Sequence, residues 1–193
     1  NNQLTYPVTN HGLPPYVITK TFSNLTERGF AIDVAEEVTS KTGVIFKPLY
    51  VDDKKKSLQS LTSREADVIV IADKHDSIAN TLSYSTPCVT HRFNLIHRLD
   101  TPSFSNLSDL DNEVIAAVTS HQATRLLQER LNNADLKYYA SVGAALLSVS
   151  SGETSAFIGS PLVSGYIIKQ QQLANLTSNP LIDFPVKGDL SFA

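Results

Sequence analysis

Cysteine is almost absent from this 193-residue chain, in which Cys88 is the only one. A single thiol cannot form an internal disulfide, and the chain lacks the cysteine pairs of a structural zinc site. Long apolar runs are absent as well. The strongest, such as residues 68–72, have the length of a strand, whereas a membrane helix needs roughly 18 apolar residues. These absences argue against a disulfide scaffold, a zinc finger and a membrane-spanning segment within the chain.

A strong charge of either sign is also missing. The formal net charge is −3, and charged residues make up 18% of the chain. The only basic run is Lys54-Lys55-Lys56, which is too short to follow a phosphate backbone, so we expect no nucleic-acid partner. With 41% hydrophobic residues, the composition is that of a globular protein with a buried core.

Signals of export and of catalysis are missing too. Neither a signal peptide nor an anchor occurs in the sequence, which fits a processed piece of an exported protein or a cytosolic protein. We find no nucleophile elbow, no paired-carboxylate motif and no phosphate-binding loop. We therefore expect a binding domain that is not an enzyme and has no cofactor and no metal.

The sequence does contain a regular alternation of strand-like and helix-like segments. In the first half, one apolar helix face is kept by Phe30, Val34 and Val38 with the neighbouring Ala31 and Ala35, and Gly43 ends that helix. Residues 67–72 form a β-branched run, which is typical of a parallel strand covered on both faces. The expected elements are strands at 4–9, 44–49 and 67–72 and helices at 30–42 and 54–63.

The same alternation restarts after an apolar strand at 93–98. The expected elements are strands at 113–118, 136–139 and 156–158 and helices at 122–131, at 142–149 and from Pro161 onward. Such a pattern implies mostly parallel sheets with helices on both faces. We assign two α/β lobes, 1–97 with 183–193 and 98–182, joined by a crossing at 93–98 and a return at 181–193. A ligand would lie in the cleft between the lobes.

Seven short motifs occur in order along nearly the whole chain. They are Pro14-Pro15-Tyr16, Gly29-Phe30-Ala31-Ile32-Asp33, Ala66-Asp67-Val68-Ile69, Tyr84-Ser85-Thr86-Pro87, Ser108-Asp109-Leu110, Ser151-Gly152-Glu153-Thr154-Ser155-Ala156 and Gly165-Tyr166. Together they resemble the type 2 periplasmic solute-binding proteins of family 3, the amino-acid-binding branch. The resemblance implies a two-lobed periplasmic-binding-protein-like α/β fold, also called a Venus flytrap, with an interlobe cleft.

A second group of short stretches lies in the second half of the chain. They are 157–160, 166–168, 173–176 and 190–193. These look like the periplasmic flytrap modules of hybrid virulence-type sensor histidine kinases. The family pattern continues past Ala193, so we expect the C-terminal end of the domain to be truncated here.

The resemblance also implies three devices that hold a zwitterionic amino acid in this family. They are an arginine for the carboxylate, a helix start for the same carboxylate, and an aspartate for the ammonium. In this sequence the arginine position falls on Ile78, the aspartate position on Ser160 and the helix start on 120–122. Two of the three devices are missing, and each charge-assisted bond contributes about 1.5–3 kcal/mol. A free α-amino acid is therefore not the expected ligand.

Several polar residues remain beside the expected cleft. Tyr16 offers an aromatic wall or packs the proline loop, and the 120–122 segment donates amides to an anion or simply caps a helix. His75 and His121 would make a pH-sensitive or metal-binding pair, but their spacing matches no metal motif and ordinary hydrogen-bonded histidines are the simpler interpretation. The candidate ligand-binding residues are Tyr16, Asp73, Lys74, His75, Ser120, His121 and Ser160.

Three classes of function follow from these observations. The first is the periplasmic sensor domain of a membrane-bound histidine kinase that signals by lobe closure. Its partners would be a small molecule or none, a neighbouring flytrap or membrane-proximal domain of the same protein, and a second copy in a homodimer. The second is a free solute-binding protein of an ABC importer, which the complete coding sequence would separate from the first. The third and most remote alternative is an enzyme on the same scaffold. An absence of turnover with candidate substrates would exclude it.

Overall fold

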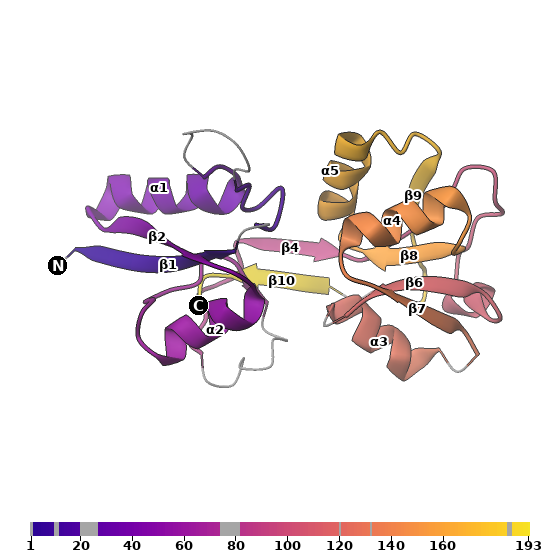
Figure 1. Cartoon of the computed structure of the whole chain (residues 1–193), viewed down its shortest axis with the longest axis horizontal. Coiled ribbons are helices and arrows are strands. Elements are labelled where there is room, and N and C mark those ends of the chain that lie inside the picture. Colours follow the sequence, from indigo (N-terminus) through magenta and orange to yellow (C-terminus); the bar gives the residue numbers. More distant parts are fainter. Residues whose placement is uncertain are drawn as a thin grey trace. The chain divides into compact units, whose positions relative to one another are not determined.

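Two compact units make up the structure, a computed structural model that describes residues 2–9, 12–19, 27–73, 82–119, 121–131, 133–184 and 187–193. The first unit is Asn1–Val89 with Asp189–Ala193, and the second is Thr90–Gly188. The chain passes to the second unit within β4 (Val89–Arg92) and returns within β10 (Lys187–Ser191) (Figure 1). These two strands are neighbours in a sheet of order β3-β10-β4.

The first unit is built around a parallel strand pair. Strand β1 (Gln3–Thr9) pairs with β2 (Ile45–Val51) in a register that runs from Gln3 opposite Ile45 to Thr9 opposite Val51. The pair is flanked by α1 (Phe30–Thr42) and α2 (Lys54–Thr62), which Figure 1 shows on opposite sides. As predicted, α1 ends at Gly43, which has φ of 73° and donates its N–H to the Thr39 carbonyl at 2.8 Å.

The buried face of α1 agrees with the predicted one at Ala31 and Ala35 and differs at Phe30. Ala31, Ile32 and Ala35 are its buried residues, whereas the Phe30 side chain is 41% exposed. Ala31 and Ile32 pack with Tyr6 and Val8 of β1 in the core of this unit. A small residue at position 31 lets the helix approach the strands closely, and the larger phenylalanine at its first position is left outside.

The predicted parallel strand at 67–72 is wrong. Only Ala72–Asp73 forms a strand, β3, and it pairs antiparallel with β10. The N–H groups of Asp67 and Val68 both donate to the Thr5 carbonyl, at 2.8 and 3.2 Å, and so do not continue a ladder. The apolar run is nevertheless buried, with Val70 2% exposed. A run of β-branched residues indicates burial, but it does not by itself specify which backbone groups will form hydrogen bonds with each other.

The second unit contains a mixed five-stranded sheet in the order β7-β6-β8-β5-β9. Its three parallel strands are β7 (Asp135–Tyr139), β6 (Val114–Val118) and β8 (Ala156–Gly159). Strands β5 (Asn94–Arg98) and β9 (Leu176–Pro180) are antiparallel additions. The helical elements are α3 (Gln122–Arg130), α4 (Val142–Ser151), α5 (Pro161–Gln171) and the short η2 (Leu107–Leu110). Pro161 occupies the first turn of α5, as predicted.

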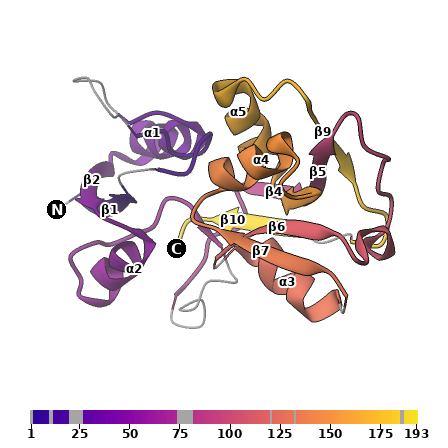
Figure 2. The ribbon, with the colours of Figure 1, turned by 45° about the vertical axis from the view of Figure 1, so that its right-hand side comes forward.

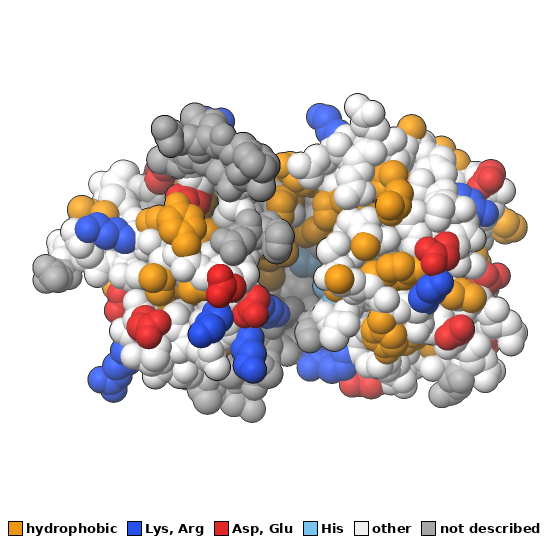
Figure 3. All heavy atoms as spheres, viewed as in Figure 1, with side chains coloured by type: hydrophobic (Ala, Val, Ile, Leu, Met, Phe, Trp, Pro, Cys, Tyr) orange, Lys and Arg blue, Asp and Glu red, His pale blue; other side chains and the backbone are white. Residues whose placement is uncertain are grey.

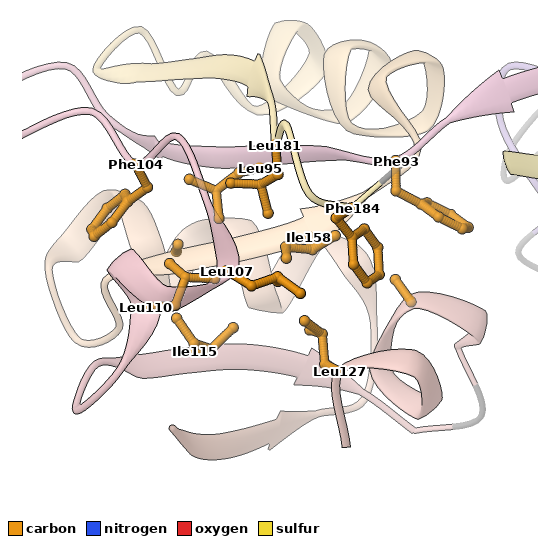
Figure 4. Close-up of a cluster of buried hydrophobic side chains, with 12 residues drawn as sticks. Phe93, Leu95, Phe104, Leu107, Leu110, Ile115, Leu127, Ile158, Leu181 and Phe184 are labelled. Carbon is orange, nitrogen blue, oxygen red and sulfur yellow. The ribbon is translucent and has the colours of Figure 1, made fainter. Parts of the chain in front are cut away.

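Alternating residues of this sheet face two separate cores. Leu95, Ile115 and Ile158 join one core with side chains from α3 and η2 (Figure 4). Their sequence neighbours Ile96, Ala116 and Phe157 join a second core with α4. Figure 2 shows α3 on one side of the sheet and α4 and α5 on the other. Both faces are therefore covered, as a sheet with parallel strands requires.

The structure revises where the two units divide. The sequence placed the boundary after residue 97 and before residue 183, with strand 93–98 as a crossing. In the structure β5 lies inside the five-stranded sheet, paired with β8 and β9, and the division falls at 89/90 and 188/189. An apolar strand with Leu95 and Ile96 fully buried belongs in a sheet covered on both faces, whereas the crossing strand β4 has only intermediate or exposed residues.

The surface carries both signs of charge. On the face shown in Figure 3, acidic and basic side chains are interspersed, with hydrophobic side chains between them. Within the described ranges, no helix is long and apolar enough to span a membrane.

Replacement of Gly165 by alanine is expected to stabilise the protein. Gly165 lies inside α5, and a Cβ there would meet no atom within 4 Å. Alanine should therefore raise the free energy of unfolding by about 0.5–1 kcal/mol through its helix propensity. Gly43→Ala is the matched control, because its left-handed backbone should make alanine cost about 1–2 kcal/mol. Urea unfolding that gave the same sign for both variants would contradict this.

Candidate functional site

The carboxyl ends of the three parallel strands of the second unit form a candidate binding edge. Each strand is followed by a helix: β6 by α3, β7 by α4 and β8 by α5. Because the strands are parallel neighbours, their carboxyl ends lie on the same edge of the sheet, and the three helices start there. In open α/β sheets, this edge is where ligands bind.

The three helix starts differ in how they are capped. The Ser141 hydroxyl caps α4 by accepting the Ala144 N–H at 3.2 Å. His121 and Ser160 occupy the corresponding positions of α3 and α5, and neither side chain makes a capping bond. The first N–H groups of a helix have no acceptor within the helix, so these two starts can donate to an anion or to polar oxygens.

Ser160 is the clearest polar feature of this edge. Its side chain is 5% exposed, and its Oγ has no hydrogen-bond partner among the residues that the structure describes. It follows directly on β8, and its carbonyl accepts the Ser164 N–H at 2.9 Å, so the backbone holds it in place. A buried hydroxyl without a partner costs free energy, and such a group is satisfied when a ligand brings the missing partner.

His121 is held in a row of aromatic rings. Its ring centroid lies 6.1 Å from that of Phe93 and 6.0 Å from that of Phe157, and His91 lies 5.3 Å from Phe93 on the far side. The His121 N–H donates to the Val118 carbonyl at 3.1 Å, which ties the helix start to the end of β6. The row fixes the imidazole beside the start of α3.

Gln122 is a polar residue at this edge that the candidate list omitted. Its Oε1 is buried and has no hydrogen-bond partner within the described part of the chain. The sequence signal was its place in the 120–122 helix start, directly after His121. A glutamine at the first position of a helix is ordinary, so only the tertiary structure shows that this oxygen is enclosed.

Two other predicted site residues belong to the first unit. Tyr16 belongs to the first unit, where its side chain is 2% exposed and its carbonyl accepts the Ala31 N–H at 3.0 Å. The backbone of Asp73 pairs with Leu190 in the β3–β10 ladder. Lys74, His75, Ile78 and Ser120 lie outside the described residues.

The shifted pKa values of the second unit belong to groups elsewhere. Hydrogen bonds from the N–H groups of Asn106 and Ser105 lower the pKa of Asp109. The 2.6 Å hydrogen bond between Lys137 and Glu153 raises the pKa of the lysine and lowers that of the glutamate. Among the described residues, no group of three or more His, Cys, Asp or Glu could hold a metal ion. The chemistry of the edge is therefore that of hydroxyl, imidazole and amide groups.

Sequence comparison relates the chain to a sensor protein. No family model matches it. Over 157 residues, 81% of the chain, it is 25% identical to the virulence sensor protein BvgS of Bordetella bronchiseptica. The match spans only 13% of that relative's length.

Structural comparison shows the fold. The periplasmic VFT2 domain of Bordetella pertussis BvgS matches with a TM-score of 0.83 at 22% identity, over 99% of this chain and 80% of that one. The amino acid ABC transporter substrate-binding protein AbpA of Streptococcus pneumoniae, bound to L-arginine, matches with a TM-score of 0.78 at 19% identity, over 99% and 80%. The chain thus has the two-lobed periplasmic-binding-protein-like fold that its motifs predicted.

Removal of the Ser160 hydroxyl should not harm the fold. Because its Oγ has no partner among the described residues, Ser160→Ala should leave the free energy of unfolding unchanged or raise it by up to about 1 kcal/mol. Ser148→Ala is the matched control. The Ser148 Oγ donates to the Ala145 carbonyl at 2.7 Å and bonds the Thr154 Oγ1 at 2.9 Å, so its loss should cost about 1–2 kcal/mol. Equal losses in urea unfolding would show that Ser160 has a structural partner.

Proposed function

We propose that this chain is the periplasmic sensor domain of a membrane-bound histidine kinase, and that it signals by closing its two lobes on a small molecule. The observation that carries the proposal is the sequence match to BvgS over 157 residues. The likeness to the BvgS VFT2 domain supports it, because the same fold covers 99% of this chain. The proposed role of the domain is binding and conformational change, not catalysis.

Lobe closure transmits a signal only if the ligand binds the closed form more tightly than the open form. The starts of α3 and α5, with Ser160 and His121, are the proposed contacts of the second lobe. Tyr16, Asp73, Lys74 and His75 are the proposed contacts of the first lobe, and Ser120 completes the α3 start. A hinge movement would then pass to a neighbouring flytrap or membrane-proximal domain of the same protein, or to a second copy in a homodimer.

The proposed ligand is not a free α-amino acid. Ser160 stands where the resemblance places the aspartate for the ammonium group, and its buried side chain is neutral. Ile78 stands where the resemblance places the arginine for the carboxylate. A neutral hydroxyl and uncapped amides favour a small molecule with hydrogen-bonding oxygens, such as a small carboxylate, over a zwitterion.

Calorimetric titration with the common amino acids should give no saturable signal with micromolar affinity. Two missing charge-assisted bonds, at about 1.5–3 kcal/mol each, correspond to a loss of about two to four orders of magnitude. A double variant, Ile78→Arg with Ser160→Asp, should gain affinity. Micromolar binding by the unmodified domain would contradict the residue assignment.

The complete coding sequence is the most direct test of the sensor role. A sensor requires a membrane-spanning helix and a histidine kinase after this domain, whereas a reading frame that encoded only a secreted binding protein would overturn the proposal. Closure is tested separately by X-ray scattering. A ligand found by thermal shift should reduce the radius of gyration, and a saturating ligand that left it unchanged would exclude lobe closure.

A further inference from the structure

A pocket of about 550 Å³ lies in the first unit, away from the strand ends described above. This volume falls in the range of small-molecule sites. It is formed by α1 together with β1 and β2, which Figure 1 shows running side by side. The lining residues are Tyr6, Glu27, Ile32, Ala35, Glu36, Thr39, Ile45, Phe46, Pro48 and Tyr50.

The periodicities of the strand and the helix determine which charged side chains line this pocket. Along β2, Phe46, Pro48 and Tyr50 line the pocket at every second position, Ile45 lines it at the start of the strand, and Lys47 is not a lining residue. Along α1, the lining residues recur at helical spacing and bring Glu36 to the pocket. All ten lining residues belong to the described part of the chain, and none of them is a lysine or an arginine.

Tyr6 places a polar atom in the pocket. Its side chain is 4% exposed and lines the pocket. The pKa of Tyr6 is raised to about 12. Burial is the largest cause, followed by the charge of Glu27, the Tyr50 phenol and the charge of Glu36. The two carboxylates therefore impose a negative potential on the floor of the pocket.

None of the described residues that line the pocket is a cation that could neutralise the two carboxylates. Glu27 accepts a hydrogen bond from the hydroxyl of Tyr50, whose side chain is 63% exposed. Lys41, the cation of α1, pairs at 2.8 Å with Glu37, which does not line the pocket. The pocket thus combines two carboxylates and two phenols with the apolar surfaces of residues such as Phe46.

We propose that this pocket binds the ammonium group of a small organic amine that carries no carboxylate. Ammonium N–H groups would donate to Glu36, Glu27 and the Tyr6 hydroxyl, and the alkyl part would lie against the apolar walls. A divalent metal ion prefers a shell of oxygen ligands without apolar walls, and the carboxylate of an amino acid would be repelled. This is a second binding site, distinct from the sensory site proposed above.

The test is calorimetric titration of the domain with cadaverine at constant ionic strength. Saturable binding is expected, and Glu36→Gln should weaken it by about tenfold or more, because a charge-assisted bond is lost. Glu36 is exposed on α1, so this variant should fold normally. Tyr6→Phe should weaken binding as well, because a hydroxyl of the pocket lining is removed. Glu37→Gln is the matched control and should change affinity less than twofold.

Several outcomes would overturn the inference. They are an absence of saturable cadaverine binding, an equal loss in Glu37→Gln and Glu36→Gln, and a Mg²⁺ titration with the same affinity and the same sensitivity to Glu36→Gln. Weakening by Ser160→Ala instead of Glu36→Gln would place the amine at the strand ends of the second unit. That result would reject amine binding at this pocket without affecting the sensor proposal. A reading frame that encoded only a secreted binding protein would reject the sensor proposal without affecting the pocket.

Discussion

Burial of the five-stranded sheet on both faces is the constraint from which the rest of the second unit follows. Adjacent residues in β5, β6 and β8, such as Leu95 and Ile96, enter opposite cores, so each face needs helices of its own. Parallel strands can be joined only by crossover connections, and these connections supply the helices. Each crossover begins at the carboxyl end of a strand, so three helix starts gather at one edge. The candidate site is thus a consequence of how the core is covered.

Polar side chains of the second unit have different roles. Ser141 uses its hydroxyl to cap its own helix, and Ser148 and Thr154 satisfy each other inside the core. Ser160 has the same side chain but no such partner among the described residues, and Gln122 shares that condition. The difference between a serine with a structural partner and one without therefore lies in the geometry around it and not in its chemistry.

Local patterns predicted the elements well. The α1 bounds, the Gly43 stop and the Pro161 start rest on periodicity and on backbone preferences, which act within a few residues. The family motifs also placed Ser160 after a strand and His121 and Gln122 at a helix start, as the structure does. Tertiary contacts were harder to predict from the sequence. The run at 67–72 has the composition of a strand, but the shared Thr5 carbonyl prevents a ladder there. The enclosed Gln122 oxygen and the aromatic row around His121 depend on residues distant in sequence, so no local pattern could reveal them.

The order of the two units along the chain has a consequence for folding. The second unit is one uninterrupted stretch, Thr90–Gly188, whereas the first needs Asp189–Ala193 to complete it. Ile69 and Ala193 exchange two backbone hydrogen bonds, at 2.7 and 3.0 Å, so the first unit joins segments that lie on either side of the second unit in the sequence. During synthesis, the second unit can therefore form its core while the first is still incomplete.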